Sequence, residues 1–121
     1  FQNWVTKTEN AINTSIDYHK IADVPYGTFL SGGIDSSLVA SSLSKHGKNV
    51  DAFTMGFDNN EINEVPYAKE VAQKFNLKHH IEYIDMSDME NVIDRIIKHY
   101  GEPFSDSSAI PTFYITKKIR E

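Results

Sequence analysis

The sequence contains no cysteine among its 121 residues. This absence excludes a disulfide framework, a thiolate zinc site and a cysteine nucleophile, so a small secreted scaffold is disfavoured. It is compatible with a reducing compartment, and we expect a cytoplasmic location.

The sequence also lacks long hydrophobic runs. Its longest uninterrupted apolar run is three residues, as at 38–40, whereas a membrane-spanning helix needs about 20. We expect no signal peptide and no membrane partner. The chain begins at Phe1 instead of Met and stops at Glu121 within a helical pattern. We therefore expect it to be a piece of a longer protein.

Positive charge is in the minority, because 12 Lys and Arg stand against 17 Asp and Glu and give a net charge of −5 at pH 7. An acidic balance excludes binding of nucleic acid through a broad basic face, although it permits a local phosphate site built from backbone amides. With 40% hydrophobic residues, a chain of this length folds as one domain that buries about two thirds of its unfolded surface.

Hydrophobic periodicity predicts helices that alternate with short buried strands. The helical segments are 3–20, 35–45, 66–75, 89–100 and a last helix that Ser108 caps, and the strands are 26–30, 50–55 and 79–84. Gly47 suits the end of the second helix, and a capping box at 87–90 suits the start of the fourth. This order predicts an α/β fold with three α/β/α layers, a parallel sheet, right-handed crossovers and helices on both faces.

The turn after the first strand is where a parallel sheet of this kind binds its ligand. This turn and the helix start after it read Ser-Gly-Gly-Ile-Asp-Ser-Ser at 31–37. Two glycines let the backbone approach a ligand, and the helix N-terminus offers free N–H groups to phosphate. Asp35 would repel a polyphosphate unless a divalent cation lay between them, so it predicts Mg²⁺. The alternative is an ordinary glycine turn capped by serine.

Three better-known loops do not fit this stretch. Gly27 and Gly32 match the two glycines of a Walker A loop, but Gly33 and Ile34 stand where lysine and Ser/Thr are required. The dinucleotide motif G-x-G-x-x-G is absent, and Phe29 breaks a G-x-S-x-G nucleophile elbow. The segment is therefore a phosphate loop without a lysine.

Residues 31–36 resemble the S-G-G-x-D-S signature of the PP-loop ATP pyrophosphatases, which include asparagine, GMP and NAD synthetases. The flanking segments 23–30 and 102–112 are similar to the glutamine-hydrolysing asparagine synthetase family. The resemblance spans nearly the whole chain. It implies a truncated adenine nucleotide alpha hydrolase-like (PP-loop) fold, in which residues 1–121 are the N-terminal part of the ATP-binding synthetase domain.

The same resemblance implies a site for ATP and Mg²⁺. In that family, ATP activates the aspartate side-chain carboxylate as β-aspartyl-AMP with release of pyrophosphate, and ammonia from glutamine then completes asparagine. The implied adenine and ribose walls are Phe29, Leu30 and Met55, and the implied pyrophosphate ligands are Ser31, Gly32, Gly33, Asp35 and Ser36. Among these, Ser31, Asp35 and Ser36 are the implied catalytic residues, and Asp35 is the metal ligand. The partners are ATP, aspartate and the glutaminase domain of the same parent chain; self-association into a homo-oligomer is left open.

Two family features are missing from the chain. The glutaminase half needs an N-terminal cysteine, and the later S-G-[DE]-G-x-D-E segment is absent as well. We therefore expect this piece alone to make no asparagine. Two alternatives stay open: another PP-loop ligase or amidotransferase that acts on a sugar or an antibiotic, and an inactive nucleotide-binding module.

Three further segments have both a structural and a functional interpretation. His79 and His80 are neighbours on a strand, so their rings point to opposite faces and do not share a metal. The loop with Asp58, Glu61 and Glu64 is solvated or closes over a ligand. The loop 105–108 is a candidate wall of the acceptor pocket.

Overall fold

Three parallel strands form the centre of the computed structural model, which describes residues 1–46, 50–57, 63–84, 89–102 and 105–120. The strands are β1 (Gly27–Phe29), β2 (Asp51–Gly56) and β3 (Lys78–Tyr83), and they lie in the order β1-β2-β3. Gly27 pairs with Asp51 at one end of the sheet, and Gly56 pairs with Tyr83 at the other. The parallel sheet predicted from the sequence is confirmed.

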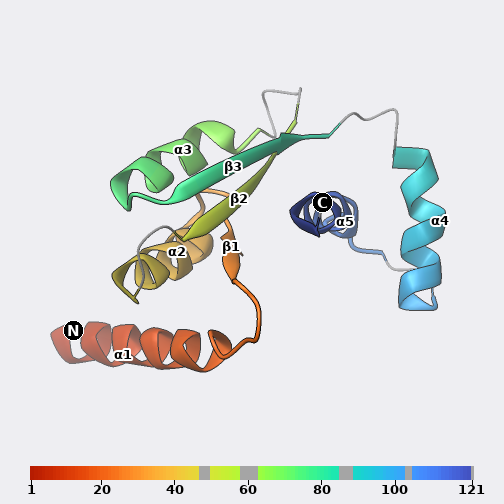
Figure 1. Ribbon diagram of the computed structural model, residues 1–121. Helices are drawn as coiled ribbons and strands as arrows, with labels where there is room; N and C mark the ends of the chain where they lie inside the picture. The colour runs from red at the N-terminus through yellow and green to blue at the C-terminus, as the bar shows by residue number, and fades with distance from the viewer. Residues whose placement is uncertain (47–49, 58–62, 85–88, 103–104, 121) are drawn as a thin grey trace.

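Helices cover both faces of this sheet, as the sequence pattern predicts (Figure 1). The helices are α1 (Gln2–His19), α2 (Ile34–His46), α3 (Val65–Lys74), α4 (Met89–Tyr100) and α5 (Ala109–Arg120). The crossover helices α2 and α3 lie on one face, and α5 lies on the other. Right-handed crossovers between strands in the order β1-β2-β3 place both connecting helices on the same face, which is the arrangement observed.

The core between the sheet and its crossover helices is built from small side chains. Leu30, Ala40, Ala52, Ala68 and Ala72 are buried together, and Ala40, Ala52 and Ala68 have no exposed surface. Alanine on both the strand and the helices lets the two layers approach closely. This close approach brings the turn after β1 against the start of α3.

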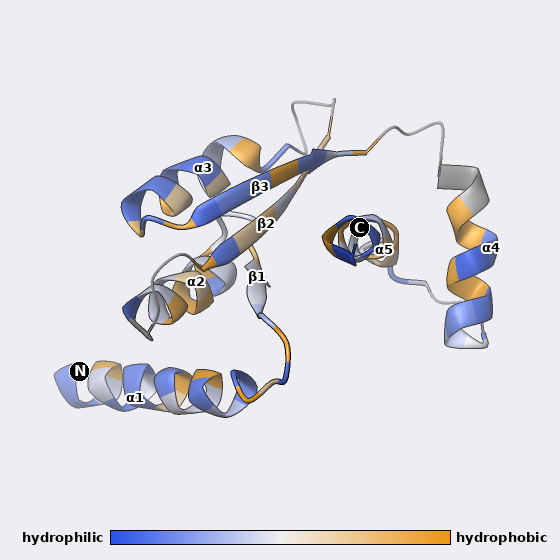
Figure 2. Cartoon of the chain, in the orientation of Figure 1, coloured by the Kyte–Doolittle hydropathy of each residue, from blue (hydrophilic) through white to orange (hydrophobic). Residues whose placement is uncertain are grey.

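Two smaller clusters attach the remaining helices. Helix α1 packs on α2 through Ile16 and Leu43, and Val50, just before β2, joins the same cluster. Helix α4 packs on α5 through Val92, Ile96 and Ala109, and Figure 2 shows both strongly hydrophobic and strongly hydrophilic residues along α4. No helix in the described ranges combines the length and the hydropathy needed to cross a membrane.

The element boundaries differ from the predicted ones by at most one residue at each end. Strand β1, which leads into the candidate site, is shorter at both ends, Gly27–Phe29 instead of 26–30. At the start of α5 the carboxylate of Asp106 accepts the Ser108 N–H at 2.8 Å, so Asp106 provides the side-chain acceptor that we expected from Ser108. The predicted end of a helix at Gly47 and the capping box at 87–90 lie outside the fully described residues.

Candidate nucleotide site at the carboxyl ends of the strands

The loop between β1 and α2 is held against α3. Gly32 has φ +83, a conformation in which side chains are strained. A Cβ at Gly32 would lie 2.6 Å from the Tyr67 carbonyl carbon and 2.6 Å from the Ala68 nitrogen. Glycine is therefore required here for two reasons: it tolerates the backbone angle, and it leaves room for the backbone of α3.

Two serine hydroxyls close the loop on itself. The Ser31 N–H donates to Ser36 Oγ at 3.3 Å, and the Gly33 N–H donates to Ser31 Oγ at 3.2 Å. The Ser36 hydroxyl donates to the Gly33 carbonyl at 3.2 Å. Since this uses the only proton of Ser36, the 2.9 Å contact between the two hydroxyls is a donation from Ser31. Both hydroxyls are thus fixed before any ligand arrives.

Helix α2 begins directly after this loop. Its first backbone bond runs from the Ser37 N–H to the Gly33 carbonyl at 3.0 Å. The N–H groups at the start of a helix have no partner within it, and the helix dipole makes this end favourable for an anion. Asp35 lies in this first turn and is exposed. A carboxylate is favourable at this position even without a metal.

A cavity of about 320 Å³ lies at the carboxyl ends of β1 and β2. It gathers five of the predicted site residues: Phe29, Leu30, Ser31, Ser36 and Met55. The other three, Gly32, Gly33 and Asp35, are not among its lining residues, and they lie beside it on the loop and in the first turn of α2. The structure therefore brings together the predicted nucleotide walls and both serines of the loop.

Helix α5 and the end of β2 supply lining residues that the sequence analysis missed: Phe53, Thr54, Phe57, Pro111, Thr112 and Ile115. Phe53 stands two residues before Met55, and the strand period of two would have placed both on one face. Nothing in the sequence indicates that α5 crosses the sheet at this point. Two residues of the segments with open interpretations, Glu64 and Ser108, also line the cavity, whereas Asp58 and Glu61 lie outside the described residues.

The two histidines of β3 point to opposite faces, as expected. His79 Nε2 lies 2.6 Å from Thr54 Oγ1, and His80 Nε2 lies 2.6 Å from Asp51 Oδ1. Burial lowers the pKa of His79, and repulsion from His80 and Lys69 lowers it further. Hydrogen bonds from His80 and Lys78 lower the pKa of Asp51. The His80 ring also stacks on Phe53, with ring centroids 4.8 Å apart.

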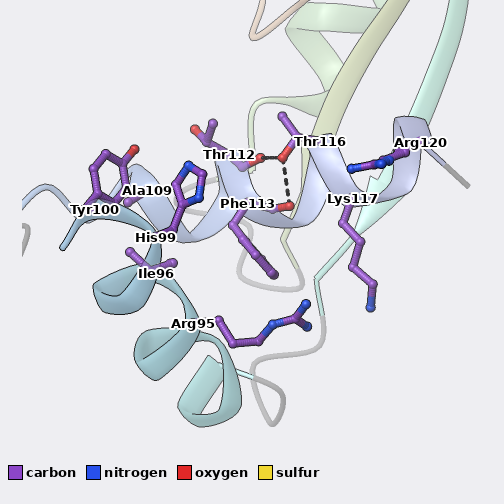
Figure 3. A pocket seen from close by; sticks show the side chains of 10 residues that line it. All are labelled: Arg95, Ile96, His99, Tyr100, Ala109, Thr112, Phe113, Thr116, Lys117 and Arg120. Carbon is purple, nitrogen blue, oxygen red and sulfur yellow. Dashed lines mark hydrogen bonds between the residues drawn. The ribbon is translucent and has the colours of Figure 1, made fainter.

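A larger cavity of about 690 Å³ lies between α4 and α5 (Figure 3). Its lining includes Arg95, Lys117 and Arg120 together with His99, and the Arg95 guanidinium lies 5.1 Å from the centroid of the Phe113 ring. None of the predicted site residues lines it. The smaller cavity is therefore the candidate nucleotide site, because it combines the glycine loop, the helix N-terminus and the strand ends.

These features define a parallel α/β protein with a lysine-free glycine loop at the carboxyl edge of its sheet. Comparison with known proteins agrees with this class. The sequence model of the family described as asparagine synthase matches residues 7–121, so the chain belongs to that family.

The relatives are long proteins. The chain is 32% identical over 117 residues to asparagine synthetase [glutamine-hydrolyzing] 1 of Bacillus subtilis, covering 97% of this chain and 18% of that protein. It is 37% identical over 102 residues to putative asparagine synthetase [glutamine-hydrolyzing] 2 of Methanocaldococcus jannaschii, covering 83% of this chain and 20% of that protein. The chain thus spans about a fifth of the length of these relatives.

A solved structure shares the fold. The NH3-dependent NAD synthetase of Campylobacter jejuni, determined in complex with the nitrate ion, superposes with a TM-score of 0.56 and 22% sequence identity. The match covers 95% of this chain and 48% of that one. This likeness confirms the predicted α/β fold.

Proposed function

We propose that residues 1–121 form the N-terminal part of the ATP-binding synthetase domain of a glutamine-dependent asparagine synthetase. The observation that carries this proposal is the cavity at the strand ends, which collects Phe29, Leu30 and Met55 beside Ser31 and Ser36. Apolar and aromatic side chains suit an adenine ring, and a glycine loop at a helix N-terminus suits phosphates. Membership of the asparagine synthase family supports the choice of reaction.

The residues of the loop would act on the departing pyrophosphate. Backbone N–H groups of the loop and of the first turn of α2 would donate to its oxygens, together with Ser31 and Ser36 once their hydroxyls turn toward the ligand. Charge on the leaving group increases as the bond to the α phosphorus breaks, so fixed donors at this point stabilise the transition state. The loop supplies donors and position, and no protein nucleophile is needed.

In the parent protein, the side-chain carboxylate of aspartate would attack the α phosphorus of ATP. The bond to the bridging oxygen breaks, pyrophosphate leaves, and β-aspartyl-AMP is formed. Ammonia, supplied from glutamine by a glutaminase domain of the same chain, would then attack the activated carbonyl and release AMP and asparagine. Ser108, at the α5 side of the cavity, is the candidate for the wall that faces the acceptor.

We expect Asp35 and the phosphates of the nucleotide to hold Mg²⁺ together at this site. No group of three or more carboxylates, histidines or cysteines in the described part of the chain is placed to hold a metal. Mg²⁺ commonly binds through one or two carboxylates together with substrate phosphates and water, and Asp35 can supply such a carboxylate from the first turn of α2. Bound there, the ion would neutralise negative charge on the pyrophosphate.

Calorimetry with a nonhydrolysable ATP analogue and Mg²⁺ tests the nucleotide site in this chain. Ser36→Ala should weaken binding, whereas Ser41→Ala should not, because the Ser41 hydroxyl bonds the Leu38 carbonyl further along the same helix. A folded wild-type chain that gives no heat up to about millimolar ligand, a binding free energy of about 4 kcal/mol, would support an inactive module instead.

Aspartate-dependent exchange between ATP and pyrophosphate tests the reaction in the parent protein. Exchange that requires aspartate is the expected result. Exchange that requires a different acid would contradict the acceptor and favour another PP-loop ligase.

A further inference from the structure

A series of hydrogen bonds runs from β3 through β2 to Leu30, the residue between β1 and the glycine loop. It starts at His79 on β3, continues through Thr54 on β2, and ends at the carbonyl of Leu30, one residue after β1. Both contacts of Thr54 Oγ1, to Leu30 O and to His79 Nε2, measure 2.6 Å. Thr54 and Leu30 are each only 2% exposed, so the bond between these two residues is buried, whereas the bond to His79 is partly buried.

The proton positions in this chain follow from counting. A carbonyl oxygen only accepts, so the single hydroxyl proton of Thr54 is donated to Leu30. Thr54 Oγ1 must then accept from His79, and Nε2 of the imidazole carries a proton. Since burial lowers the pKa of His79, the ring is neutral at pH 7. It is therefore the tautomer with hydrogen on Nε2 and none on Nδ1.

The last of these hydrogen bonds, from Thr54 to the Leu30 carbonyl, fixes the orientation of the first amide of the loop. The carbonyl of Leu30 and the N–H of Ser31 belong to one planar peptide unit, so fixing one direction fixes the other. The Leu30 N–H is held as well, because it donates to the Phe53 carbonyl at 2.8 Å. The Ser31 N–H in turn donates to Ser36 Oγ at 3.3 Å. The orientation of the His79 ring is thus linked to Ser36 through the Thr54 hydroxyl and the Leu30–Ser31 peptide.

We propose that His79 is a positioning residue for the phosphate loop: through Thr54 it sets the plane of the Leu30–Ser31 peptide and with it the donors that hold pyrophosphate. This inference rests on the proposed function for its ligand. It concerns a residue outside the cavity, since His79 is not among the lining residues. No contact of His79 with substrate is involved.

The matched variants for this proposal differ in one hydrogen-bond donor. His79→Leu removes the donor, whereas His79→Gln retains an N–H group at a similar reach. Thr54→Val removes the hydroxyl with little change of shape, and Thr54→Ser retains it. Ile96→Ala serves as the control for lost stability, because Ile96 is buried between α4 and α5 and outside the sheet.

The experiment uses the 121-residue chain and two ligands. Binding of magnesium pyrophosphate and of AMP is measured by calorimetry for each variant. His79→Leu and Thr54→Val should weaken pyrophosphate binding by roughly three- to tenfold, the usual effect of one hydrogen bond, and AMP binding by less than about twofold. His79→Gln and Thr54→Ser should bind both ligands like the wild type. Equal losses for both ligands, or a loss in Ile96→Ala as large as in His79→Leu, would overturn the positioning role.

Nuclear magnetic resonance tests the same proposal without a ligand. The imidazole nitrogens of His79 should report the Nε2–H tautomer, and the Ser31 amide signal should move in His79→Leu but not in His79→Gln. An Nδ1–H tautomer or an unmoved Ser31 amide would contradict the proposal. A wild-type chain that binds neither ligand would instead overturn the proposed function, and the Ser31 amide would still decide whether His79 orders the loop.

Discussion

Gly32 lies against the backbone of Tyr67, so the glycine loop after β1 packs directly on the first turn of α3. A Cβ on Gly32 would come within 2.6 Å of the Tyr67 carbonyl carbon. Backbone atoms cannot rotate away as a side chain can. The conformation of the loop therefore depends on a helix that begins more than thirty residues later in the chain.

Replacing Gly32 by alanine should destabilise the chain by at least about 2 kcal/mol, because a strained backbone angle is combined with a backbone clash. Gly101→Ala is the matched control. Gly101 also has a positive φ of 78, but no atom lies within 4 Å of its added Cβ. Urea unfolding of both variants separates the cost of the strained backbone angle from the cost of the clash with α3. Equal losses in the two variants would show that α3 does not constrain the loop.

Replacing Asp35 by asparagine should change nucleotide binding more than stability, because the side chain is exposed. Without Asp35, the dissociation constant of magnesium ATP should rise about tenfold, the loss expected for one charged contact of about 1.5 kcal/mol. Binding of ATP in the absence of Mg²⁺ should not weaken, since a repelling carboxylate has been removed. Asp23→Asn, before β1, is the control. If Asp35→Asn keeps the full effect of Mg²⁺, the metal role of Asp35 is wrong.

The aromatic side chain of Phe29 is predicted to contact the adenine ring. Phe29 is 47% exposed although it ends a strand, so Phe29→Ala should cost little stability. Loss of a stacking contact should weaken AMP binding roughly tenfold. Tyr26→Ala is the control, because Tyr26 is similarly exposed at 42% and does not line the cavity. Calorimetry with AMP measures both, and an equal effect of the two changes would remove the adenine role.

Stability should decrease in two steps as the pH falls. The pKa of His79 is lowered in the folded chain, chiefly by burial, so the unfolded chain binds a proton first and stability falls as the pH drops below about 6.5. The pKa of Asp51 is lowered chiefly by its hydrogen bond with His80. Its contribution is complete above about pH 4 and is lost as the pH falls through the folded value.

Thermal unfolding measured from about pH 8 to about pH 3 should show both steps in the wild type, because this range brackets the ordinary pKa values of histidine and aspartate. His79→Gln should remove the first step, and Asp51→Asn should reduce the second, to which Asp106 also contributes because hydrogen bonds with Ser108 lower its pKa. A first step that persists in His79→Gln would assign it to another histidine.

The packing of α4 on α5 should depend on Ile96. Ile96 is 6% exposed in the cluster with Val92 and Ala109, so Ile96→Ala should cost about 2–4 kcal/mol of unfolding free energy. Ile93, on the same helix, is 45% exposed. Ile93→Ala should therefore cost less than about 1 kcal/mol. Equal costs in urea unfolding would contradict the packing.

Much of the fold follows from local sequence pattern. Strands of a few apolar residues between helices with one apolar face favour a parallel sheet, because each crossover must bury its helix on that sheet. The glycine pair at 32–33 followed by Asp35 indicates a phosphate loop for an equally local reason, since only glycine permits the required backbone angle and close approach. These features need no knowledge of distant contacts.

The rest of the site depends on residues that are far apart in the chain. Thr112 and Ile115 line the cavity only because α5 crosses the face opposite α2 and α3. Likewise, His79 reaches the loop only through the register that places β3 beside β2 and β2 beside β1. The sequence by itself determined the strands, the helices and the glycine loop, because these depend on neighbours within a few residues. Only the tertiary structure decided which side chains surround that loop, because packing of separate elements brings them together.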